Sequence, residues 1–458
     1  MKIDNSINLD TLKDKLPGFW RLSGEKIAAI EESYDPGLGA PVFTEKGKYT
    51  TRGWTEWTQG FQYGSAILQY DATGDESFLD IGRKNTEEKM ASHVSHIGVH
   101  DHGFNNVSTY GNLLRLAKEG KTETSKSQQL FYELALKISG AVQASRWTDR
   151  AEGGFIYSFN GPHSLFVDTV RTIRALEVSH LLGHSLQGEQ DQNHNLLERA
   201  IQHALTTAKY SVFYGEGRDQ YDEWGRTAHE CVFNTKNGAY RCPNSQQGFS
   251  GFTTWTRGLG WAMLGFAEQL EFLETVDEND LTIFGGKEAV KTVFLKAAKA
   301  TCDFYIAHSS ADGISYWDTG APNIHKLGNY QAVNADPFNP HEPVDSSASA
   351  IGAQGLLRLG KYLLDNKDDK GQSYFNAGLT ITNTLLQAPY LSLDKGHQGL
   401  LLHTIYHYPN NWDFIPEGSK VPNGESCMWG DYHMRELMLL LQSMVEDRPY
   451  YTFYQGLI

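Results

Sequence analysis

Residues 70–76 read Tyr-Asp-Ala-Thr-Gly-Asp-Glu and separate two stretches of helical pattern. Gly74 can end the first helix in the left-handed conformation, and Asp75 can cap the start of the second. Similar short breaks follow along the chain around residues 120–121, 183–188, 277–286 and 365–371. The repeated order of helix, short turn and helix predicts an all-α fold built from helix pairs.

Apolar residues recur at helical spacing between these breaks. Three such stripes are Leu130, Leu134, Ile138 and Val142; Val290, Val293, Phe294, Ala297 and Phe304; and Met434, Leu437, Met438, Leu441 and Val445. Each stripe has to be buried against a neighbouring helix. Strand-like alternation is short and local, as in residues 399–406.

Long connections rich in glycine and aromatic residues interrupt the helices around 100–110, 150–168, 215–255, 310–345 and 400–430. Loops of this length are usually functional, and the spacing of the breaks is too uneven for a repeat solenoid. A closed toroid of helix pairs with its long loops at one mouth accounts for both features. Since no Pro-, Ser- or Gly-rich linker divides the chain, we predict one domain over residues 1–458, with an N-terminal extension of about 50 residues packed on it.

The composition narrows the classes of function. The 458 residues include 40 Lys+Arg and 55 Asp+Glu, a formal net charge of -15, without a dense basic run. This balance argues against a nucleic-acid partner and a polybasic membrane anchor. Four cysteines without a CxxC pair support neither a zinc ribbon nor a disulfide scaffold. A polar N-terminus and the lack of a long apolar run predict a cytoplasmic protein, or a periplasmic one if a signal peptide has been removed.

The first polar-aromatic cluster is His100-Asp101-His102-Gly103-Phe104. One interpretation is that Asp101 caps the following helix and that the histidines lie on the surface. A metal site is poorly supported here because the cluster lacks an i, i+4 pair of ligands. His403 and His407 have that spacing, but the glutamate of the HExxH motif is missing. The sequence therefore predicts no metal.

The second cluster is Ser164-Leu165-Phe166-Val167-Asp168-Thr169. Asp168 can be the N-cap of the helical pattern that follows. Alternatively, Phe166 and Val167 can desolvate its carboxyl, which would raise the pKa and suit a general acid. Asp101 and Asp168 together are then candidates for the paired carboxylates of sugar chemistry.

The third cluster covers residues 247–261. Trp255 and Trp261 offer flat apolar faces to a sugar ring, and Arg257 between them could bind a carboxylate bidentately. Two core tryptophans and a structural arginine are the alternative. The glycines around Gly258 do not match GxGxxG, so no dinucleotide site is predicted.

These clusters belong to an ordered set of motifs. The set comprises Trp57-Thr58-Gln59-Gly60-Phe61, His100-Asp101-His102-Gly103-Phe104, Phe166-Val167-Asp168-Thr169, Gln247-Gly248, Trp255-Thr256-Arg257-Gly258 with Trp261, Tyr316-Trp317-Asp318, Asp345-Ser346-Ser347-Ala348-Ser349-Ala350-Ile351, and Met428-Trp429-Gly430-Asp431-Tyr432. In their number, order and spacing, the sequence resembles the unsaturated glucuronyl hydrolases of glycoside hydrolase family 88, from about Trp54 to Tyr451.

The resemblance implies an (α/α)6 barrel and a hydrolase that needs no cofactor. Its expected substrate is a di- or oligosaccharide capped at the non-reducing end by the 4,5-unsaturated uronic acid that polysaccharide lyases leave. The enzyme hydrates the C4=C5 enol ether, the resulting hemiketal opens, and the neighbouring sugar departs. Asp168 would be the general acid/base and Asp101 the second essential carboxylate. The implied substrate contacts are Trp57 and Trp261 as stacking walls, His100, Phe159, His229, Gln247, Trp255 and Arg257, with Tyr406 and Ser426 from the C-terminal loop.

Two departures from the family pattern concern this site. Arg171 and Arg174 follow Asp168 where the family often has small or apolar residues, and a neighbouring arginine would lower the pKa of that aspartate. Phe159 stands where a tryptophan is usual. An unsaturated galacturonyl or rhamnogalacturonyl hydrolase, a non-catalytic oligosaccharide-binding barrel and a helical scaffold for protein partners are the alternative functions.

Overall fold

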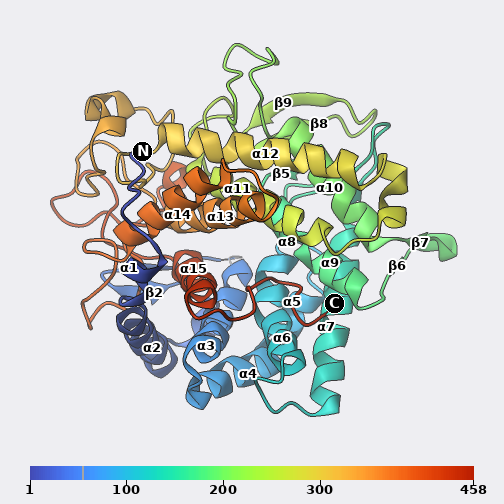
Figure 1. Cartoon of the computed structure of the whole chain (residues 1–458), viewed down its shortest axis with the longest axis horizontal. Helices are drawn as coiled ribbons and strands as arrows, with labels where there is room; N and C mark the ends of the chain where they lie inside the picture. The colour runs from blue at the N-terminus through green and yellow to red at the C-terminus, as the bar shows by residue number, and fades with distance from the viewer. Residues whose placement is uncertain (54–55, 458) are drawn as a thin grey trace.

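The computed structural model describes residues 1–53 and 56–457, so Trp54, the expected start of the family resemblance, lies outside the described residues. Six helical segments form its inner ring: α3 (Gln59–Thr73), the π-helix η3 (Gly103–Gly111) continued by α6 (Asn112–Lys118), α8 (Thr169–Thr172) with α9 (Arg174–Leu181), α11 (Thr256–Leu273), α13 (Ser346–Asp365) and α15 (Met428–Val445). Each segment packs on the next, and α15 packs back on α3. The ring is therefore closed (Figure 1).

Six further helices pack around this ring. They are α2 (Leu16–Ser33), α4 (Glu76–Lys89), α7 (Lys126–Ser145), α10 (Leu196–Tyr210), α12 (Lys287–His308) and α14 (Gly371–Leu385). Each outer helix pairs with an inner segment, as α12 does with α11 and α14 with α13. This arrangement confirms the predicted (α/α)6 barrel.

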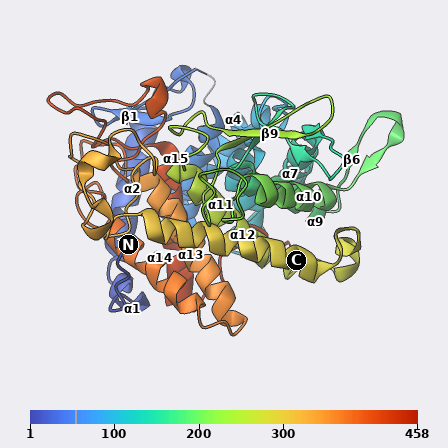
Figure 2. The ribbon, with the colours of Figure 1, turned by 90° about the horizontal axis from the view of Figure 1, so that it is seen from above.

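The remaining elements are short and lie in the connections. The helical turns are α1 (Leu9–Lys13), η1 (Pro36–Leu38), η2 (Glu56–Thr58), α5 (Ala91–Val94), η4 (Glu189–Asp191), η5 (Glu278–Phe284), η6 (Ile324–Leu327), η7 (Tyr330–Ala332) and η8 (Tyr408–Asn410). The antiparallel sheets are β1 (Phe43–Glu45) with β2 (Lys48–Thr50), β3 (Trp147–Thr148) with β4 (Phe155–Ile156), β6 (Leu186–Gln187) with β7 (Asn193–His194), and β5 (Ser164–Phe166), β8 (Glu230–Phe233) and β9 (Tyr240–Asn244) in that order. Figure 2 shows β1 and β9 along the same edge of the molecule, while α14 reaches the opposite edge.

The turn at residues 70–76 has the predicted structure. Gly74 ends α3 with φ = 72°, and Asp75 Oδ1 accepts a hydrogen bond from the Ser77 N–H at 3.0 Å before α4. Glycine also permits close packing inside the ring, because a Cβ at Gly64 would lie 2.6 Å from the Ser108 carbonyl oxygen. Such close approaches draw α3 against η3.

Two expectations about local structure are wrong. Residues 103–111 form the π-helix η3 within the stretch expected to be a loop around 100–110. Residues 399–406 do not form a strand, since their isolated bridge joins Leu401 to Leu391. In both regions tertiary packing decides the backbone, because η3 is buried throughout its length and residues 399–406 are almost all buried.

The apolar stripe of α7 is a further correction. Leu130, Leu134 and Ile138 are 55%, 56% and 38% exposed, although their spacing predicted burial. α7 lies in the outer ring, and its buried face carries Tyr132 and Leu136 beside small and polar residues. A Cβ at Gly140 would lie 2.5 Å from the Ala175 carbonyl oxygen. Close backbone approach therefore selects the other face. The stripes of α12 and α15 are buried except for the partly buried Val293 and Val445.

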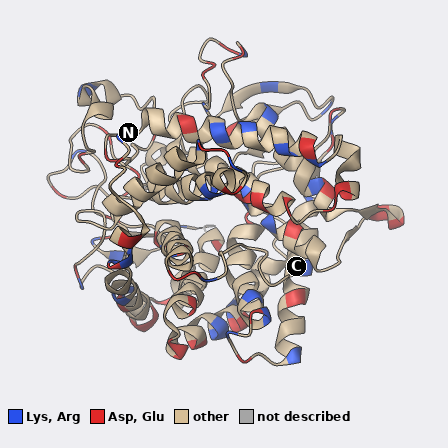
Figure 3. Ribbon diagram, viewed as in Figure 1, with Lys and Arg blue, Asp and Glu red and all other residues tan. Residues whose placement is uncertain are grey.

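One continuous hydrophobic cluster runs from Leu12 to Tyr454 and supports the single domain, which stays a prediction. Within the expected N-terminal extension, α2 packs on α3 and α15, in the outer ring of the barrel. Figure 3 shows Lys and Arg interspersed with Asp and Glu along α12. Among the described residues, the helices are too short or too polar to cross a membrane.

Candidate active site

A cavity of about 260 Å³ opens at the loop end of the barrel. It is small beside the roughly 300–1,000 Å³ typical of sites for drug-sized ligands. Ten of the twelve predicted site residues line it: Trp57, His100, Asp101, Phe159, Asp168, Gln247, Trp255, Arg257, Trp261 and Tyr406. Residues far apart in the sequence therefore meet at one place, as predicted.

The starts of the inner segments bring these side chains together. Trp57 precedes α3, Asp101 precedes η3, and Asp168 immediately precedes α8. Arg257 lies in the first turn of α11, where its guanidinium contacts Asp345 at the N-cap of α13. The start of α15 is also close, because Trp429 stacks on Trp57 at 5.0 Å between ring centroids. The N-terminal ends of α3, η3, α8 and α11 therefore adjoin the cavity, and those of α13 and α15 contact residues of its lining.

His100 joins the two predicted catalytic aspartates. Its Nε2 lies 3.3 Å from Asp168 Oδ2 and 3.8 Å from Asp101 Oδ1. All three residues are buried, and Asp168 Oδ1 has no hydrogen-bond partner among the described residues. One imidazole thus lies between two carboxylates on the wall of the cavity.

Neither aspartate is occupied as a helix cap. Asp168 is at the N-cap position of α8 but makes no capping hydrogen bond with its side chain. At Asp101 the backbone carbonyl, not the carboxylate, accepts the N–H groups of Phe104 and Asn105. The interpretation of these two residues as caps is therefore wrong, and both carboxylates stay available for chemistry.

Burial and mutual charge move the pKa values of this group apart. Burial raises the pKa of Asp101, and the opposing effect of His100 does not overcome it. Burial also acts to raise the pKa of Asp168, but the closer His100 imidazole outweighs this and the pKa is lowered. The two aspartates raise the pKa of His100 despite its burial. The expectation that the pKa of Asp168 is raised is therefore wrong, although burial acts in that direction.

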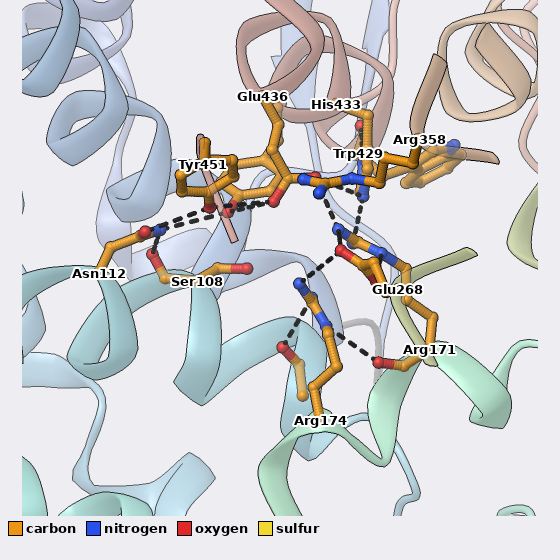
Figure 4. A network of polar contacts seen from close by, with 12 residues as sticks. Ser108, Asn112, Arg171, Arg174, Glu268, Arg358, Trp429, His433, Glu436 and Tyr451 are labelled. Atoms are coloured by element: carbon orange, nitrogen blue, oxygen red, sulfur yellow. Dashed lines mark hydrogen bonds and ion pairs between the residues drawn. The ribbon is translucent and has the colours of Figure 1, made fainter. Parts of the chain in front are cut away.

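Arg171 and Arg174 belong to a buried polar network with Glu268, His433 and Glu436 (Figure 4). Arg171 donates to Glu268 Oε2 at 3.1 Å and to Glu436 Oε2 at 2.6 Å, and Arg174 Nη1 lies 3.5 Å from Glu268 Oε1. The expected effect of these arginines on Asp168 is therefore absent, and His100 lowers its pKa instead.

The same network supports the aromatic floor of the cavity. Arg171 Nη1 donates to His433 Nε2 at 2.7 Å, and the His433 ring packs edge-on against Trp261 at 4.8 Å. Burial lowers the pKa of His433 to about 3, so its Nε2 is a neutral acceptor. Trp261 is thus held from below by a hydrogen-bonded imidazole.

The terminal N–H groups of Arg257 already have partners within the protein. Its Nη1 donates to Asp345 Oδ2 at 2.8 Å and to the Ile405 carbonyl, while Nη2 donates to Gln247 Oε1 at 2.8 Å and to the Tyr406 carbonyl at 2.6 Å. These bonds use all four terminal N–H groups. Arg257 therefore ties the cavity wall together, and its bidentate contact with a substrate carboxylate stays a prediction.

Two predicted contacts lie behind the wall. His229 packs between Phe166 and Trp255 at 4.5 Å from each ring, and its Nδ1 accepts the backbone N–H of Gln246 at 3.1 Å. Burial lowers the pKa of His229 to about 3, which makes it a neutral support of the 246–247 segment. Ser426 donates to Asp431 Oδ1 at 2.8 Å and does not line the cavity.

The cavity also includes residues outside the predicted set: Glu56, His96, Val99, Phe104, Asn160, Phe166, Gln246, His407, Asn410 and Trp412. His407, Asn410 and Trp412 come from one loop, which Asp413 holds by accepting the N–H groups of Tyr406 at 2.5 Å and His407 at 2.9 Å. The close spacing of aromatic and amide side chains at 406–412 was the available sequence signal for this loop.

His100, Asp101 and Asp168 could also offer ligand atoms to a metal ion, because one atom of each lies within 4.8 Å of the others. His100 Nε2 is within hydrogen-bonding distance of Asp168, and an imidazole nitrogen must be unprotonated to bind a metal. The prediction that the site uses no metal stays a prediction.

Comparisons with known proteins agree with this arrangement. The family model "Glycosyl Hydrolase Family 88" matches residues 41–285, more than half of the chain. The unsaturated glucuronyl hydrolase of Bacillus sp. (strain GL1) is 28% identical over 402 residues, covering 86% of this chain and 88% of the relative. An unsaturated chondroitin disaccharide hydrolase of Streptococcus agalactiae serotype III is 23% identical over 389 residues, covering 84% of this chain and 81% of the relative.

Solved structures share the fold. The crystal structure of the Bacillus sp. GL1 unsaturated glucuronyl hydrolase superimposes with a TM-score of 0.70 at 23% sequence identity, covering 94% of this chain and 97% of that one. The structure of an unsaturated glucuronyl hydrolase specific for heparin gives a TM-score of 0.71 at 19% identity, covering 95% and 98%.

Proposed function

The chain belongs to glycoside hydrolase family 88, and on this premise we propose that it hydrolyses an unsaturated glucuronyl residue from oligosaccharides. The substrate is a di- or oligosaccharide capped by a 4,5-unsaturated glucuronic acid at its non-reducing end, as polysaccharide lyases produce. Similarity to the unsaturated glucuronyl hydrolase of Bacillus sp. (strain GL1) supports the proposal. The observation that carries it is the group His100, Asp101 and Asp168, in which both carboxylates are free of helix capping and face an aromatic cavity.

Asp168 is the proposed general acid/base. His100 Nε2 lies 3.3 Å from Asp168 Oδ2 and has a raised pKa, so this pair holds a proton that Asp168 can pass to C4 of the enol ether. The ionised Asp168 then takes a proton from water as the water oxygen bonds to C5. Water is thereby added across C4=C5, the hemiketal opens, and the neighbouring sugar departs with its glycosidic oxygen.

Asp101 is the proposed second carboxylate. Its carboxylate lies 3.8 Å from His100 Nε2 and stabilises the positive charge of the imidazole when Asp168 has given up its proton. Substrate binding adds a further negative charge beside Asp168, which raises the pKa of that residue and favours the protonated form needed to begin the reaction.

Recognition of the uronate carboxylate is local. The four terminal N–H groups of the Arg257 guanidinium are bonded to the protein. The N-termini of the inner segments and the His100 imidazole supply positive potential. Trp57 and Trp261 are the proposed stacking walls, and Phe159, Gln247, Trp255 and Tyr406 complete the subsite. The small volume of the cavity supports removal of one terminal residue at a time.

The test is incubation with unsaturated disaccharides from glycosaminoglycans, ulvan, gellan and xanthan, followed by loss of the enol-ether ultraviolet band. We expect turnover of at least one of these and no measurable turnover by Asp168→Asn. Asp75→Asn is the matched control, because Asp75 is an exposed helix cap and asparagine caps equally well. A panel without turnover refutes the proposed function, and near-normal rates in Asp168→Asn remove that residue from its role.

Two outcomes separate the alternative functions. Cleavage restricted to unsaturated galacturonyl products would favour a galacturonyl or rhamnogalacturonyl hydrolase. Binding of oligosaccharide without release of product would favour a non-catalytic sugar-binding barrel.

A further inference from the structure

Three exposed aromatic side chains belong to the loops that precede α11, close in sequence to residues that line the candidate active site. Phe249 and Phe252 belong to the connection between β9 and α11 and are 48% and 46% exposed. Tyr221, from the preceding long loop, is 56% exposed and packs against Phe252 with 5.4 Å between ring centroids. We call these three residues the aromatic shelf.

The backbone of the shelf is held firmly. The Phe249 N–H donates to Asp318 Oδ2 at 2.9 Å, and the Phe252 N–H donates to Ser250 Oγ at 3.0 Å. The Phe252 carbonyl accepts from Arg226 Nη1 at 3.1 Å, and Arg226 is itself paired with Asp219. The exposure of the rings is therefore a fixed feature of the fold and does not result from a loose chain end.

Glycine residues allow this loop to lie close to the cavity wall. A Cβ at Gly248 would lie 2.7 Å from Trp255 Cβ, and a Cβ at Gly251 would lie 2.6 Å from the Pro243 carbonyl oxygen. The backbone beside Phe249 is thus pressed against Trp255, a residue of the cavity lining.

The shelf follows the cavity lining closely along the chain. Gln246 and Gln247 line the cavity, and Phe249 follows two residues later on the same loop. The cavity holds only about 260 Å³, so an oligosaccharide whose terminal uronate fills it has to continue outside. Single exposed aromatic residues are ordinary, whereas Tyr221 and Phe252 pack against each other and stay about half exposed.

We propose that Phe249, Phe252 and Tyr221 form an outer subsite that stacks on the sugar rings beyond the cleaved linkage. This inference rests on the proposed function and adds the length of the preferred substrate. The apolar faces of pyranose rings fit flat aromatic surfaces. Arg226, which holds the loop, is neutralised by its ion pair with Asp219. The ligand is the reducing-end portion of a tri- or tetrasaccharide, and a disaccharide is too short to use the shelf fully.

The experiment compares kcat/KM on an unsaturated disaccharide and an unsaturated tetrasaccharide from the same polysaccharide. Wild type is expected to prefer the tetrasaccharide. Phe249→Ala/Phe252→Ala is expected to lower kcat/KM for the tetrasaccharide by about fivefold to twentyfold and to leave the disaccharide value within about twofold. Phe249→Tyr/Phe252→Tyr keeps the rings and is expected to keep the preference.

Phe131→Ala is the matched control, because Phe131 is 40% exposed on α7 and does not line the cavity; its preference should equal that of wild type. An equal loss on both substrates would show that the loop only shapes the cavity and would overturn the proposal. An unchanged preference for the tetrasaccharide in the double alanine variant would also overturn the proposal. A wild type that does not prefer the tetrasaccharide would do the same. If wild type cleaves neither substrate, the proposed function itself fails, whereas disaccharide cleavage without a shelf effect refutes the outer subsite alone.

Discussion

The role of Arg257 can be decided by replacing it with methionine, which keeps much of the side-chain length and removes the charge. Arg257 and Asp345 are 1% and 0% exposed, and the variant leaves the Asp345 carboxylate buried without its cation. Breaking a buried ion pair in this way costs about 3–5 kcal/mol. The carbonyls of Ile405 and Tyr406 lose their donor as well. We therefore expect a large fall in the free energy of unfolding of Arg257→Met.

A second substitution isolates the stranded charge. Asp345 Oδ1 caps α13 by accepting the N–H groups of Ser347 and Ala348, and asparagine can retain these bonds. Because Asp345→Asn removes the unpaired charge, the double variant Arg257→Met/Asp345→Asn is expected to be more stable than Arg257→Met alone. The assay is urea unfolding followed by far-ultraviolet circular dichroism, with midpoints and m-values compared across the four proteins of the cycle.

Kinetics complete this test. If Arg257 ties the wall together, the stability loss accompanies any loss in kcat/KM, because Gln247 and the 405–406 backbone lose their common support. A loss of unfolding free energy below about 1 kcal/mol combined with a large rise in KM would refute the structural role. That result would mean that the guanidinium releases its protein partners and binds the substrate carboxylate.

Two further predictions concern protons. His100→Gln removes the imidazole whose pKa is raised, so the alkaline limb of the kcat/KM profile should move to lower pH, where a carboxyl group alone can hold the proton. The control is His102→Gln, at a buried histidine bonded to Ser139, which should keep the alkaline limb of the wild type. An unmoved limb in His100→Gln would exclude the proton relay. Burial raises the pKa of Glu177 from 4.5 to about 8, so its contribution to stability is fully present below pH 4.5 and is lost as pH rises to about 8. Glu177→Gln should therefore lose less unfolding free energy than wild type between pH 5 and pH 8, and parallel curves in urea titrations would contradict this.

Local sequence signals were sufficient for the fold. Gly74 and Asp75 have the backbone conformation and hydrogen bond expected of a helix end and a helix start, because both roles depend on the residue and its nearest neighbours. The stripe of α15 is buried at Met434, Leu437, Met438 and Leu441, since an inner helix is surrounded by others. The stripe of α7 failed because an outer helix packs with one face, and the close approach at Gly140 selects which face that is.

The candidate site was only partly predictable for a related reason. Asp101, Asp168 and the tryptophans were found because they stand next to helix starts, and the barrel brings helix starts together. Arg257 has partners 88 residues away at Asp345 and more than 140 residues away at Ile405 and Tyr406. The sequence therefore did not reveal that its terminal N–H groups are bonded to the protein. The same distance in sequence concealed Glu268 and Glu436 as the partners of Arg171.

These partnerships reconcile a net charge of -15 with an anionic substrate. Arg171 and Arg174 are paired with glutamates beneath the floor of the cavity, and Arg257 is paired with Asp345 in its wall. The paired guanidinium groups stabilise the shape of the cavity and leave attraction of the uronate to the converging helix N-termini and His100. Such a field is short in range, which suits one terminal carboxylate; a long polyanion would meet the acidic outer surface. The proposed preference for a short lyase product thus rests on where the positive charges are placed and not on their number.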